Sequence, residues 1–450
     1  MTLLEELAGI DGSRSAIIAP GVRYDFAELV EGARSLAGDL EGARVVANCS
    51  DCASMIVTLA ACDGSAEAIA LMSPQHTPDV LVSLISIISA DVVLTDNSDA
   101  LRAEGLSVSA VSKPTELIDA MSRIRRGTGD PTRWIMTTSG TTSTPKMVEH
   151  TLASLVRTVR RDTQKGRGQV WGMLYDQTRF AGLQVLLQSL LSGACLAVPD
   201  QEADMEAQLA FLGEAGCTHL SATPTMWRKI LMTINGPKLD LQQVTLGGEI
   251  ADDVVLASLS RTFPSARISH VFASTEAGVG LSVKDGQAGF PADYLTDAPA
   301  GIDLKIEQGR LWVRNDEVGG DYLDGRGALS RDGWVDTGDL VEQRNGRVYF
   351  KGRETGVINV GGNKVHPEEV ETAILTHPHV TMARVYSRAN PIMGSLVMAD
   401  IVPGPSAPET LKHDLTAFLR ERLEKYMIPA SFRVTEGFEV NPAGKIRRDA

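Results

Sequence analysis

The segment that decides the fold is Val45–Thr95, VVANCSDCASMIVTLAACDGSAEAIALMSPQHTPDVLVSLISIISADVVLT. Short apolar runs of strand length alternate in it with longer apolar stretches of helical length, and polar or turn-forming residues separate them. The strand-like runs are Val45–Ala47, Ala68–Met72 and Val92–Thr95, and the helical stretches are Met55–Ala61 and Leu81–Ile88. This alternation predicts a sheet whose strands are connected by crossover helices, as in α/β folds.

Two other regions of hydrophobic patterning follow along the chain. The alternation returns from Gln169 to Val271, whereas Gly301–Phe350 contains short alternating runs that predict antiparallel hairpins and a small β-barrel section. After Arg353 we expect a helix over Pro367–Leu375, strands over Thr381–Tyr386 and Leu396–Val402, and a helix over Ala407–Tyr426. The predicted fold class is therefore α/β, with a large N-terminal domain of layered α/β sheets (residues 1–352) and a small mobile α+β C-terminal domain (residues 353–450).

Composition narrows the class of protein. The 450 residues are 43% hydrophobic and 22% charged, which is typical of a globular protein with a substantial core. The net charge of −14 argues against general affinity for nucleic acid or an anionic membrane. The longest apolar stretches, Val80–Leu94 and Leu183–Val198, contain polar residues and are shorter than a membrane span of roughly 18 residues. We therefore expect neither a nucleic-acid partner nor a membrane span.

The N-terminus and the cysteines predict a cytoplasmic protein. The start MTLLEELAGIDG lacks the basic and apolar regions of a signal peptide. Five cysteines are an odd and sparse set, which suits a reducing compartment. Cys49 and Cys52 form a CxxC, for which a redox or metal role competes with simple packing. Packing is favoured because the motif opens the apolar segment Ala53–Cys62 and no second pair has zinc spacing.

The densest chemical signal is Thr137–Lys146, TTSGTTSTPK, directly after the apolar run Trp134–Met136. A strand end that opens into hydroxyls, a glycine and a lysine offers the N–H groups, O–H donors and positive charge that hold phosphate oxygens. The loop is not a Walker A motif, because Pro145 stands where glycine is needed and Met147 where Ser or Thr is needed. Taken alone, the pattern also fits a plain linker.

Four further motifs follow this loop in order. They are FASTE at Phe272–Glu276, WVDTGD at Trp334–Asp339, GR at Gly352–Arg353 with GGNKVHPEEVE at Gly361–Glu371, and NPAGKIR at Asn441–Arg447. With these motifs the chain resembles the adenylate-forming superfamily of acyl- and aryl-CoA synthetases, non-ribosomal adenylation domains and luciferases. It is most similar to a free-standing acyl- or aryl-CoA synthetase, and the resemblance covers nearly the whole chain.

The resemblance implies a site for MgATP. The residues implied to grip the β- and γ-phosphates are Thr138, Ser139, Gly140, Thr141, Thr142 and Lys146, although Ser143 replaces the family's second loop glycine. Those implied to enclose adenine are Gly247, Gly248, Glu249, Phe272, Ala273 and Ser274, with Gly247 also bordering the acid. Thr275 would contact the α-phosphate and Glu276 would hold Mg²⁺.

The resemblance also implies the ribose contacts and the catalytic cation. Asp339, assisted by Arg353, would bind both ribose hydroxyls, because a carboxylate accepts two hydrogen bonds at once. Lys364 stands where the family often has a basic residue facing the phosphates. Lys445 matches the catalytic lysine, whose charge stabilises the negative charge that builds when a carboxylate attacks the α-phosphorus. The alternative for Lys445 is an ordinary solvated lysine, which its register with the other motifs disfavours.

The segment Tyr175–Gly182, YDQTRFAG, resembles the acid-binding region, where many acyl-CoA synthetases have His at the position of Arg179. Two interpretations of Arg179 stay open. It binds the substrate carboxylate or a second acidic group on the substrate, or it forms a structural ion pair with Asp176. Gly182 is assigned to the same acid-binding region, and His150 is expected to hold backbone rather than to transfer protons.

The predicted activity is an acid–thiol ligase reaction in two steps. A small carboxylic acid and MgATP form an acyl-adenylate and pyrophosphate, and a thiol then displaces AMP. Coenzyme A is the favoured acceptor, reached when the C-terminal domain rotates and presents Gly361 and Gly362; Thr355 replaces the family's usual hinge Asp or Lys. Alternative acceptors are a carrier-protein phosphopantetheine or an amine. A non-catalytic adenylate-binding regulatory or scaffold protein is the alternative from another class.

Overall fold

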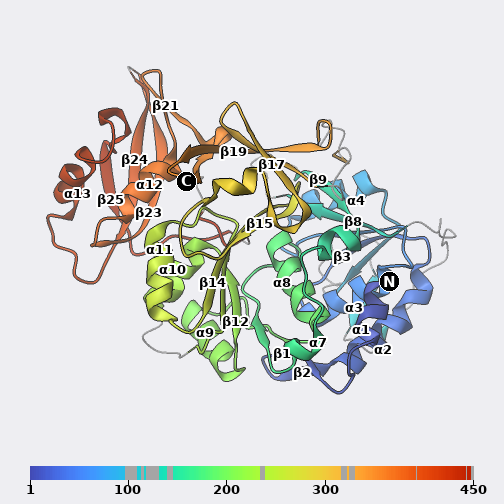
Figure 1. Ribbon diagram of the computed structural model, residues 1–450. Coiled ribbons are helices and arrows are strands. Elements are labelled where there is room, and N and C mark those ends of the chain that lie inside the picture. The colour runs from blue at the N-terminus through green and yellow to red at the C-terminus, as the bar shows by residue number, and fades with distance from the viewer. Residues whose placement is uncertain are drawn as a thin grey trace.

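The computed structural model describes residues 1–96, 109–112, 116–117, 131–138, 145–233, 239–315, 322–323, 330–391, 393–441 and 443–446. In this part of the chain the strands form four sheets. Figure 1 shows three of them in a large N-terminal part, with the C-terminal strands and helices attached at one side. In the same residues, every helix is too short or too polar to cross a membrane.

The first sheet has seven strands in the order β7-β6-β5-β3-β4-β8-β9. Its strands are β3 (Arg44–Asn48), β4 (Ala68–Leu71), β5 (Val92–Thr95), β6 (Ser109–Ser112), β7 (Glu116–Leu117), β8 (Arg133–Thr137) and β9 (Met147–His150). β5, β3, β4 and β8 are parallel neighbours. Helices α3 (Cys52–Cys62) and α4 (Pro78–Ile88) connect the first three strands. The predicted alternation between Val45 and Thr95 is therefore confirmed.

The second sheet has eight strands in the order β15-β14-β13-β12-β10-β11-β1-β2. Its strands are β1 (Ser15–Ala19), β2 (Val22–Asp25), β10 (Val170–Gly172), β11 (Cys195–Ala197), β12 (His219–Ala222), β13 (Gln243–Gly247), β14 (Arg267–Ser274) and β15 (Gly278–Val283). The helices around it are α1 (Leu3–Ala8), α2 (Phe26–Ala37), α6 (Leu152–Val156), α7 (Thr163–Gly166), α8 (Phe180–Leu191), α9 (Met205–Glu214), α10 (Pro224–Thr233) and α11 (Asp253–Thr262). The six inner strands are parallel, whereas β2 and β15 are antiparallel edges.

One core joins these two sheets. Its buried side chains come from both sheets and from helices that include α2, α3 and α8. All eleven residues of α3 are buried, as expected of a helix that is apolar on every side. Cys49 and Cys52 are buried in this core as free thiols, and burial raises the pKa of both well above the usual value. These observations favour the packing interpretation of the CxxC.

The third sheet is antiparallel, in the order β16-β20-β19-β18-β17. Its strands are β16 (Phe290–Pro291), β17 (Asp303–Glu307), β18 (Arg310–Arg314), β19 (Trp334–Arg344) and β20 (Arg347–Arg353). The predicted hairpins are present, but the predicted barrel section is an open sheet in the described residues. The two-residue strand β16 presents too short an edge to close a barrel against β17.

The fourth sheet belongs to the C-terminal part. It contains β21 (Ile358–Val360), β22 (Asn363–Val365), β23 (Val380–Asn390), β24 (Gly394–Pro403) and β25 (Ser431–Val434), with helices α12 (Pro367–Leu375) and α13 (Leu411–Arg420). α13 is shorter than the predicted helix over Ala407–Tyr426, because Pro408 disfavours a helical conformation at its start and a separate 3-10 turn, Lys425–Met427, follows it. These elements enclose their own apolar core.

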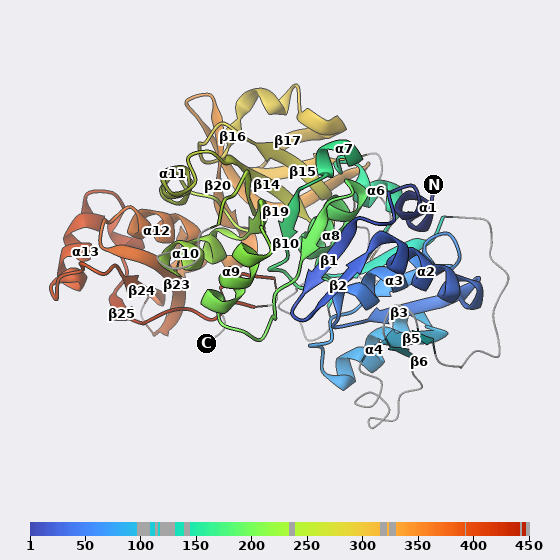
Figure 2. The same cartoon turned by 90° about the horizontal axis from the view of Figure 1, so that it is seen from below.

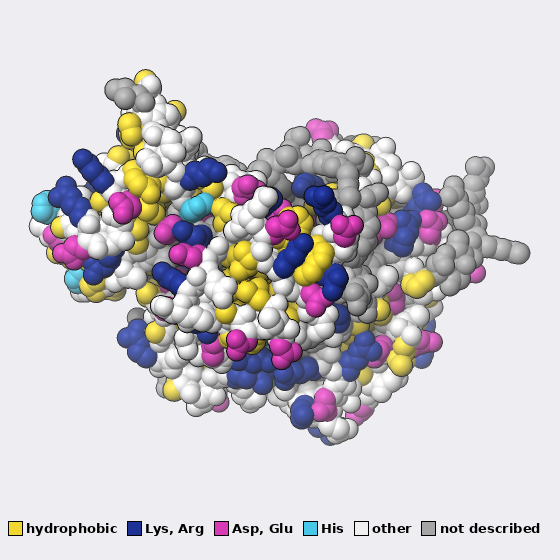
Figure 3. Space-filling model, turned by 45° about the horizontal axis from the view of Figure 1, so that its top comes forward, with side chains coloured by type: hydrophobic (Ala, Val, Ile, Leu, Met, Phe, Trp, Pro, Cys, Tyr) yellow, Lys and Arg dark blue, Asp and Glu magenta, His cyan; other side chains and the backbone are white. Residues whose placement is uncertain are grey.

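The C-terminal part lies beside α10 and α11 in both ribbon views (Figures 1 and 2). Arg353 ends β20, and the 3-10 turn Glu354–Gly356, which includes the predicted hinge residue Thr355, leads into β21. The division of the chain between residues 352 and 353 stays a prediction. Figure 3 shows acidic and basic side chains scattered over one face of the molecule, with hydrophobic side chains between them.

Candidate active site

The candidate site lies at the carboxyl ends of the parallel strands β12, β13 and β14, where α/β sheets commonly bind ligands. Gly247 pairs with Val271 across β13 and β14, so the predicted turn Gly247–Glu249 and the predicted segment Phe272–Ser274 are neighbours. The Glu249 carboxylate accepts a hydrogen bond from the Thr225 N–H at 3.0 Å. This bond ties the turn to the start of α10.

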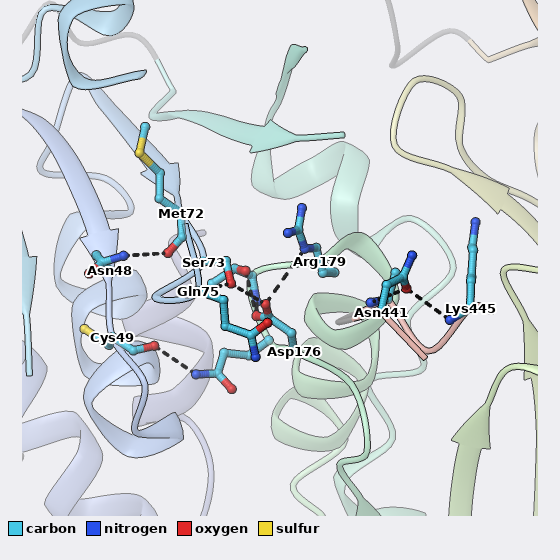
Figure 4. A network of polar contacts seen from close by, with 12 residues as sticks. Asn48, Cys49, Met72, Ser73, Gln75, Asp176, Arg179, Asn441 and Lys445 are labelled. Carbon is cyan, nitrogen blue, oxygen red and sulfur yellow. Dashed lines mark hydrogen bonds and ion pairs between the residues drawn. The ribbon is translucent and has the colours of Figure 1, made fainter. Parts of the chain in front are cut away.

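A tight turn near the C-terminus, closed by Asn441 and Lys445 and called the hook below, lies at this site. The Asn441 N–H donates to the Lys445 carbonyl at 2.8 Å, and the Lys445 N–H donates to the Asn441 side chain at 3.1 Å. The Thr223 hydroxyl, just after β12, donates to the Gly444 carbonyl at 2.5 Å. The hook is thereby anchored on the large part of the molecule, and Figure 4 shows the Lys445 side chain extending from it.

Lys445 lies against the predicted adenine-binding turn. A Cβ atom built on Gly248 would be 3.5 Å from Lys445 Cε, so the lysine side chain passes close to the turn. Burial lowers the pKa of Lys445. The carboxylates of Glu249, Asp339 and Glu276 oppose this shift, whereas the Arg353 charge adds to it. The structure therefore gathers five predicted site residues from distant parts of the sequence.

Asp339 and Arg353 face each other on β19 and β20. They are a register pair, and Arg353 Nε lies 3.5 Å from Asp339 Oδ1. The guanidinium also donates to the Thr337 carbonyl at 2.7 Å. Burial raises the pKa of Asp339, and the Arg353 and Lys445 charges counteract this shift. The pair thus provides a partly buried carboxylate held in place by a cation.

The predicted phosphate loop is described only at its two ends. The Thr138 N–H donates to the Lys146 carbonyl at 2.8 Å, which closes the base of the loop. Lys146 Nζ lies 4.7 Å from the centre of the Tyr322 ring. Ser139, Gly140, Thr141 and Thr142 lie outside the described residues, as does Ser143. The grip of this loop on phosphates stays a prediction.

The segment Phe272–Glu276 is held by packing and by hydrogen bonds. The Phe272 ring stacks on Phe350 at 5.1 Å between ring centres, so one side of this predicted adenine wall packs against β20. The Ser274 hydroxyl accepts a hydrogen bond from the Ala277 N–H at 3.0 Å. The His150 Nε2–H donates to the Thr275 carbonyl at 2.8 Å, in agreement with the prediction that His150 holds backbone.

Arg179 and Gly182 lie at the start of α8, close to Asp176. A Cβ atom on Gly182 would be 2.1 Å from the Asp176 carbonyl oxygen, so this glycine allows the helix to pack against the preceding loop. Arg179 Nε lies 3.8 Å from Asp176 Oδ2. The ion pair is therefore present, at a distance too long for a hydrogen bond.

Lys364, Gly361 and Gly362 lie elsewhere. They belong to the exposed hairpin between β21 and β22, where both glycines have positive φ angles of 58° and 89°. Among the described residues, no hydrogen bond or ion pair joins this hairpin to the residues around Lys445. Their predicted roles at the phosphates and at the acceptor stay predictions.

The sequence analysis missed Thr223 and Met226, which receive the hook. A Cβ atom on Gly444 would lie 2.4 Å from Met226 Sδ and 3.2 Å from Thr223 Cγ2. The available signal is the sequence SATP at Ser221–Pro224, a hydroxyl residue followed by proline at the end of a buried strand. It predicts the start of a helix, but nothing local indicates what docks there.

Comparison with known proteins identifies the family. The AMP-binding enzyme profile matches residues 4–323, and the AMP-binding enzyme C-terminal domain profile matches residues 369–445. The chain belongs to the AMP-binding enzyme family. It is 29% identical to 2-succinylbenzoate–CoA ligase of Bacillus velezensis (strain DSM 23117 / BGSC 10A6 / LMG 26770 / FZB42) over 338 residues, which cover 71% of this chain and 68% of the relative.

Several solved structures share the fold of this chain. The Bacillus subtilis O-succinylbenzoate coenzyme A synthetase in complex with ATP and magnesium ion superposes with a TM-score of 0.75 at 22% identity, covering 100% of this chain and 98% of that one. An amide bond synthetase from Marinactinospora thermotolerans gives a TM-score of 0.77 at 20% identity, covering 99% and 97%. The predicted arrangement of a large N-terminal and a smaller C-terminal α/β region is thus confirmed.

Proposed function

We infer that this AMP-binding enzyme uses ATP to activate a small carboxylic acid and then transfers the acyl group to coenzyme A. The observation that carries this inference is the docked hook, which brings Lys445 to the strand ends beside Gly248. A cation anchored at that place is preorganised for charge that develops during the reaction. The 2-succinylbenzoate–CoA ligases among the relatives support the reaction class.

In the first step a carboxylate oxygen attacks the α-phosphorus of ATP. A P–O bond forms, the bond to the bridging oxygen breaks, and pyrophosphate leaves with that electron pair. We assign to Lys445 the stabilisation of the charge that builds on the transferring phosphoryl group. Thr275 is assigned to the α-phosphate and the pair Asp339–Arg353 to the ribose hydroxyls. The turn at Gly248 is assigned to the adenine.

The carboxylate of Glu276 fits a magnesium ion that is bound together with a triphosphate. Its charge acts on Lys445, so it lies in the same site. The described residues contain no cluster of three or more metal-binding side chains. Mg²⁺ commonly uses one or two carboxylates together with phosphate oxygens and water. When bound, the ion would neutralise part of the phosphate charge, while Glu276 orients it.

In the second step a thiolate attacks the acyl carbon of the mixed anhydride. The thiol has already lost its proton to solvent; a C–S bond forms, the bond between the acyl carbon and the bridging phosphate oxygen breaks, and AMP leaves with that electron pair. Lys445 serves only the first step. We assign the exposed turn Gly361–Gly362 to the second step, after rotation of the C-terminal part about Glu354–Gly356.

Coenzyme A is the proposed acceptor, and a carrier-protein phosphopantetheine or an amine is the alternative. The likeness to an amide bond synthetase shows that the fold by itself does not decide the acceptor.

The test is pyrophosphate release across a panel of carboxylic acids, with and without coenzyme A, followed by detection of the thioester. Acid-dependent release with thioester formation is expected. Acid-dependent release without thioester would refute coenzyme A as the acceptor, and no acid-dependent release would refute the activation step.

A further inference from the structure

Arg179 Nε and His76 Nδ1 are buried beyond the carboxyl ends of strands in the two large sheets, and neither has a hydrogen-bond partner in the described residues. His76 lies in the turn after β4 of the seven-stranded sheet, and its N–H donates to the Ser73 carbonyl at 3.1 Å. Arg179 lies just before α8, in the segment that follows β10 of the eight-stranded sheet. The positive charge of Arg179 acts on His76, so the two side chains face one region.

The Asp176 carboxylate forms no hydrogen bond with the Arg179 side chain, and three of its roughly four acceptor positions are taken by other donors. Asp176 Oδ2 accepts a hydrogen bond from the Ser73 hydroxyl at 2.7 Å. Asp176 Oδ1 accepts two from Thr178, from the N–H at 2.8 Å and from the hydroxyl at 2.6 Å. Figure 4 shows the end of the Arg179 side chain directed away from Asp176. The ion pair neutralises charge at a distance and leaves the donors of the guanidinium free for another acceptor.

A guanidinium in this position is costly unless it meets an anion. The Arg179 side chain is 14% exposed, and burying a charged group without hydrogen bonds is unfavourable. Arginine presents a planar fork of five donors that matches a carboxylate in a bidentate arrangement. Among the described residues, the ion-pair partner of Arg179 is Asp176, at 3.8 Å. The geometry therefore points to an anionic group supplied by a ligand.

This anionic group is not the reacting carboxylate. The reacting carboxylate must reach the α-phosphorus beside Lys445, and one of its oxygens must keep a free lone pair for the attack. A bidentate guanidinium would hold both oxygens and reduce their nucleophilicity. Arg179 is a second cation, on the α8 side of the site, whereas Lys445 is anchored beside β12 and β13. An acid with two acidic groups would use both cations.

We propose that Arg179, together with His76, binds a second carboxylate of the acid substrate, so that the enzyme prefers dicarboxylic acids. This proposal rests on the proposed activation of an acid by ATP. Arg179 donates the bidentate pair of hydrogen bonds, and the His76 Nδ1–H donates a third. Removing the second carboxylate from the substrate would leave these buried donors unpaired, which is a strong basis for discrimination.

The test compares matched acids that differ by one carboxylate. The pairs are terephthalate with benzoate, adipate with hexanoate, and 2-succinylbenzoate with 4-oxo-4-phenylbutanoate. The readout is kcat/KM for acid-dependent pyrophosphate release. We expect the wild-type enzyme to favour the diacid of at least one pair by roughly 100-fold. Arg179→Gln should bring the ratio of diacid to monoacid close to one, and Arg179→Lys should retain part of the preference.

Arg228→Gln is the matched control. Arg228 is similarly buried, with a side chain 12% exposed, but it is hydrogen-bonded to Asp252 at the start of α11. This variant should lower thermal stability without changing the diacid-to-monoacid ratio. If Arg179 is purely structural, Arg179→Gln and Asp176→Asn will lower both members of a pair in parallel, and the proposal is overturned.

The proposed role of Arg179 and the proposed acid activation can be refuted separately. A wild-type enzyme that activates monoacids as well as diacids would overturn the role of Arg179 and leave acid activation intact. An enzyme that releases no pyrophosphate with any acid would overturn both. If Arg179→Gln does not fold, the ratio of diacid to monoacid is measured in His76→Asn and Arg179→Lys instead. Both variants should lower this ratio, and an unchanged ratio in both would refute the proposal.

Discussion

Replacement of Gly444 by alanine should slow adenylation while leaving Lys445 itself in place. Gly444 has a φ of 72°, a backbone conformation that costs a residue with a Cβ about 1–2 kcal/mol. The new Cβ would lie 2.4 Å from Met226 Sδ, so the side chain of Met226 or the hook must move. If the hook moves, the hydrogen bond from Thr223 to the Gly444 carbonyl is lost, at a cost of about 1 kcal/mol.

Together these terms disfavour the docked hook by about 2–3 kcal/mol, which corresponds to a decrease in adenylation rate of roughly 30- to 150-fold. The assay is acid-dependent pyrophosphate release under single-turnover conditions. Transfer of a preformed acyl-adenylate to coenzyme A should stay near the wild-type rate, because that step does not need the docked hook.

Gly437→Ala is the control for the hook variant. Gly437 lies in the same C-terminal segment, and a Cβ there would meet no atom within 4 Å. It should adenylate at the wild-type rate. Equal adenylation rates in Gly444→Ala and Gly437→Ala, or equal losses in both half-reactions of Gly444→Ala, would refute the assignment of the hook to the first step.

Three further predictions concern single side chains. Lys445→Ala should lower adenylation by roughly 100- to 1000-fold and retain ATP binding by calorimetry; loss of binding, or no adenylation in the wild-type protein, would favour a purely structural or non-catalytic role. Burial raises the pKa of Asp339, and the Arg353 charge opposes this shift. Arg353→Gln should therefore raise the pH below which KM for ATP increases; the same pH dependence of KM in the variant and the wild type would contradict this. Burial also raises the pKa of Asp63 above 3.8, against the hydrogen bonds from Trp134 and the Leu3 N–H. The folded state therefore holds that proton more tightly, and wild-type stability to urea should fall as pH rises from about 4 through the raised pKa. The Asp63→Asn variant should lack this slope, and a slope that persists would exclude Asp63 as its cause.

Local sequence patterns predicted the elements well where burial is periodic. The runs between Val45 and Thr95 became β3, α3, β4, α4 and β5 with small shifts at their ends, and α12 has the predicted bounds. The helix predicted over Ala407–Tyr426 was too long, because amphipathic spacing continues through a turn that α13 does not cross. The barrel was predicted from alternation, which indicates strand faces but carries no information on closure of a sheet.

Motif order also predicted some site residues better than others, because it carries no information on packing. Motif order placed Lys445, Asp339 and Glu249 in one site, and their mutual charge effects agree with that placement. It assigned the aromatic ring of Phe272 to adenine, whereas stacking on Phe350 occupies one face of that ring. The phosphate-loop residues between Thr138 and Pro145 stay predictions.

The sequence by itself determined the α/β class, the five ordered motifs and the membership of an adenylate-forming family, because each depends on residues close together in the chain. Only the tertiary structure decided that Thr223 receives Gly444, 221 residues away. It also decided that Asp176 accepts hydrogen bonds from Ser73 and Thr178, whereas Arg179 Nε has no hydrogen-bonded acceptor in the described residues. Such contacts depend on which strand ends meet in space, and residue periodicity carries no record of that.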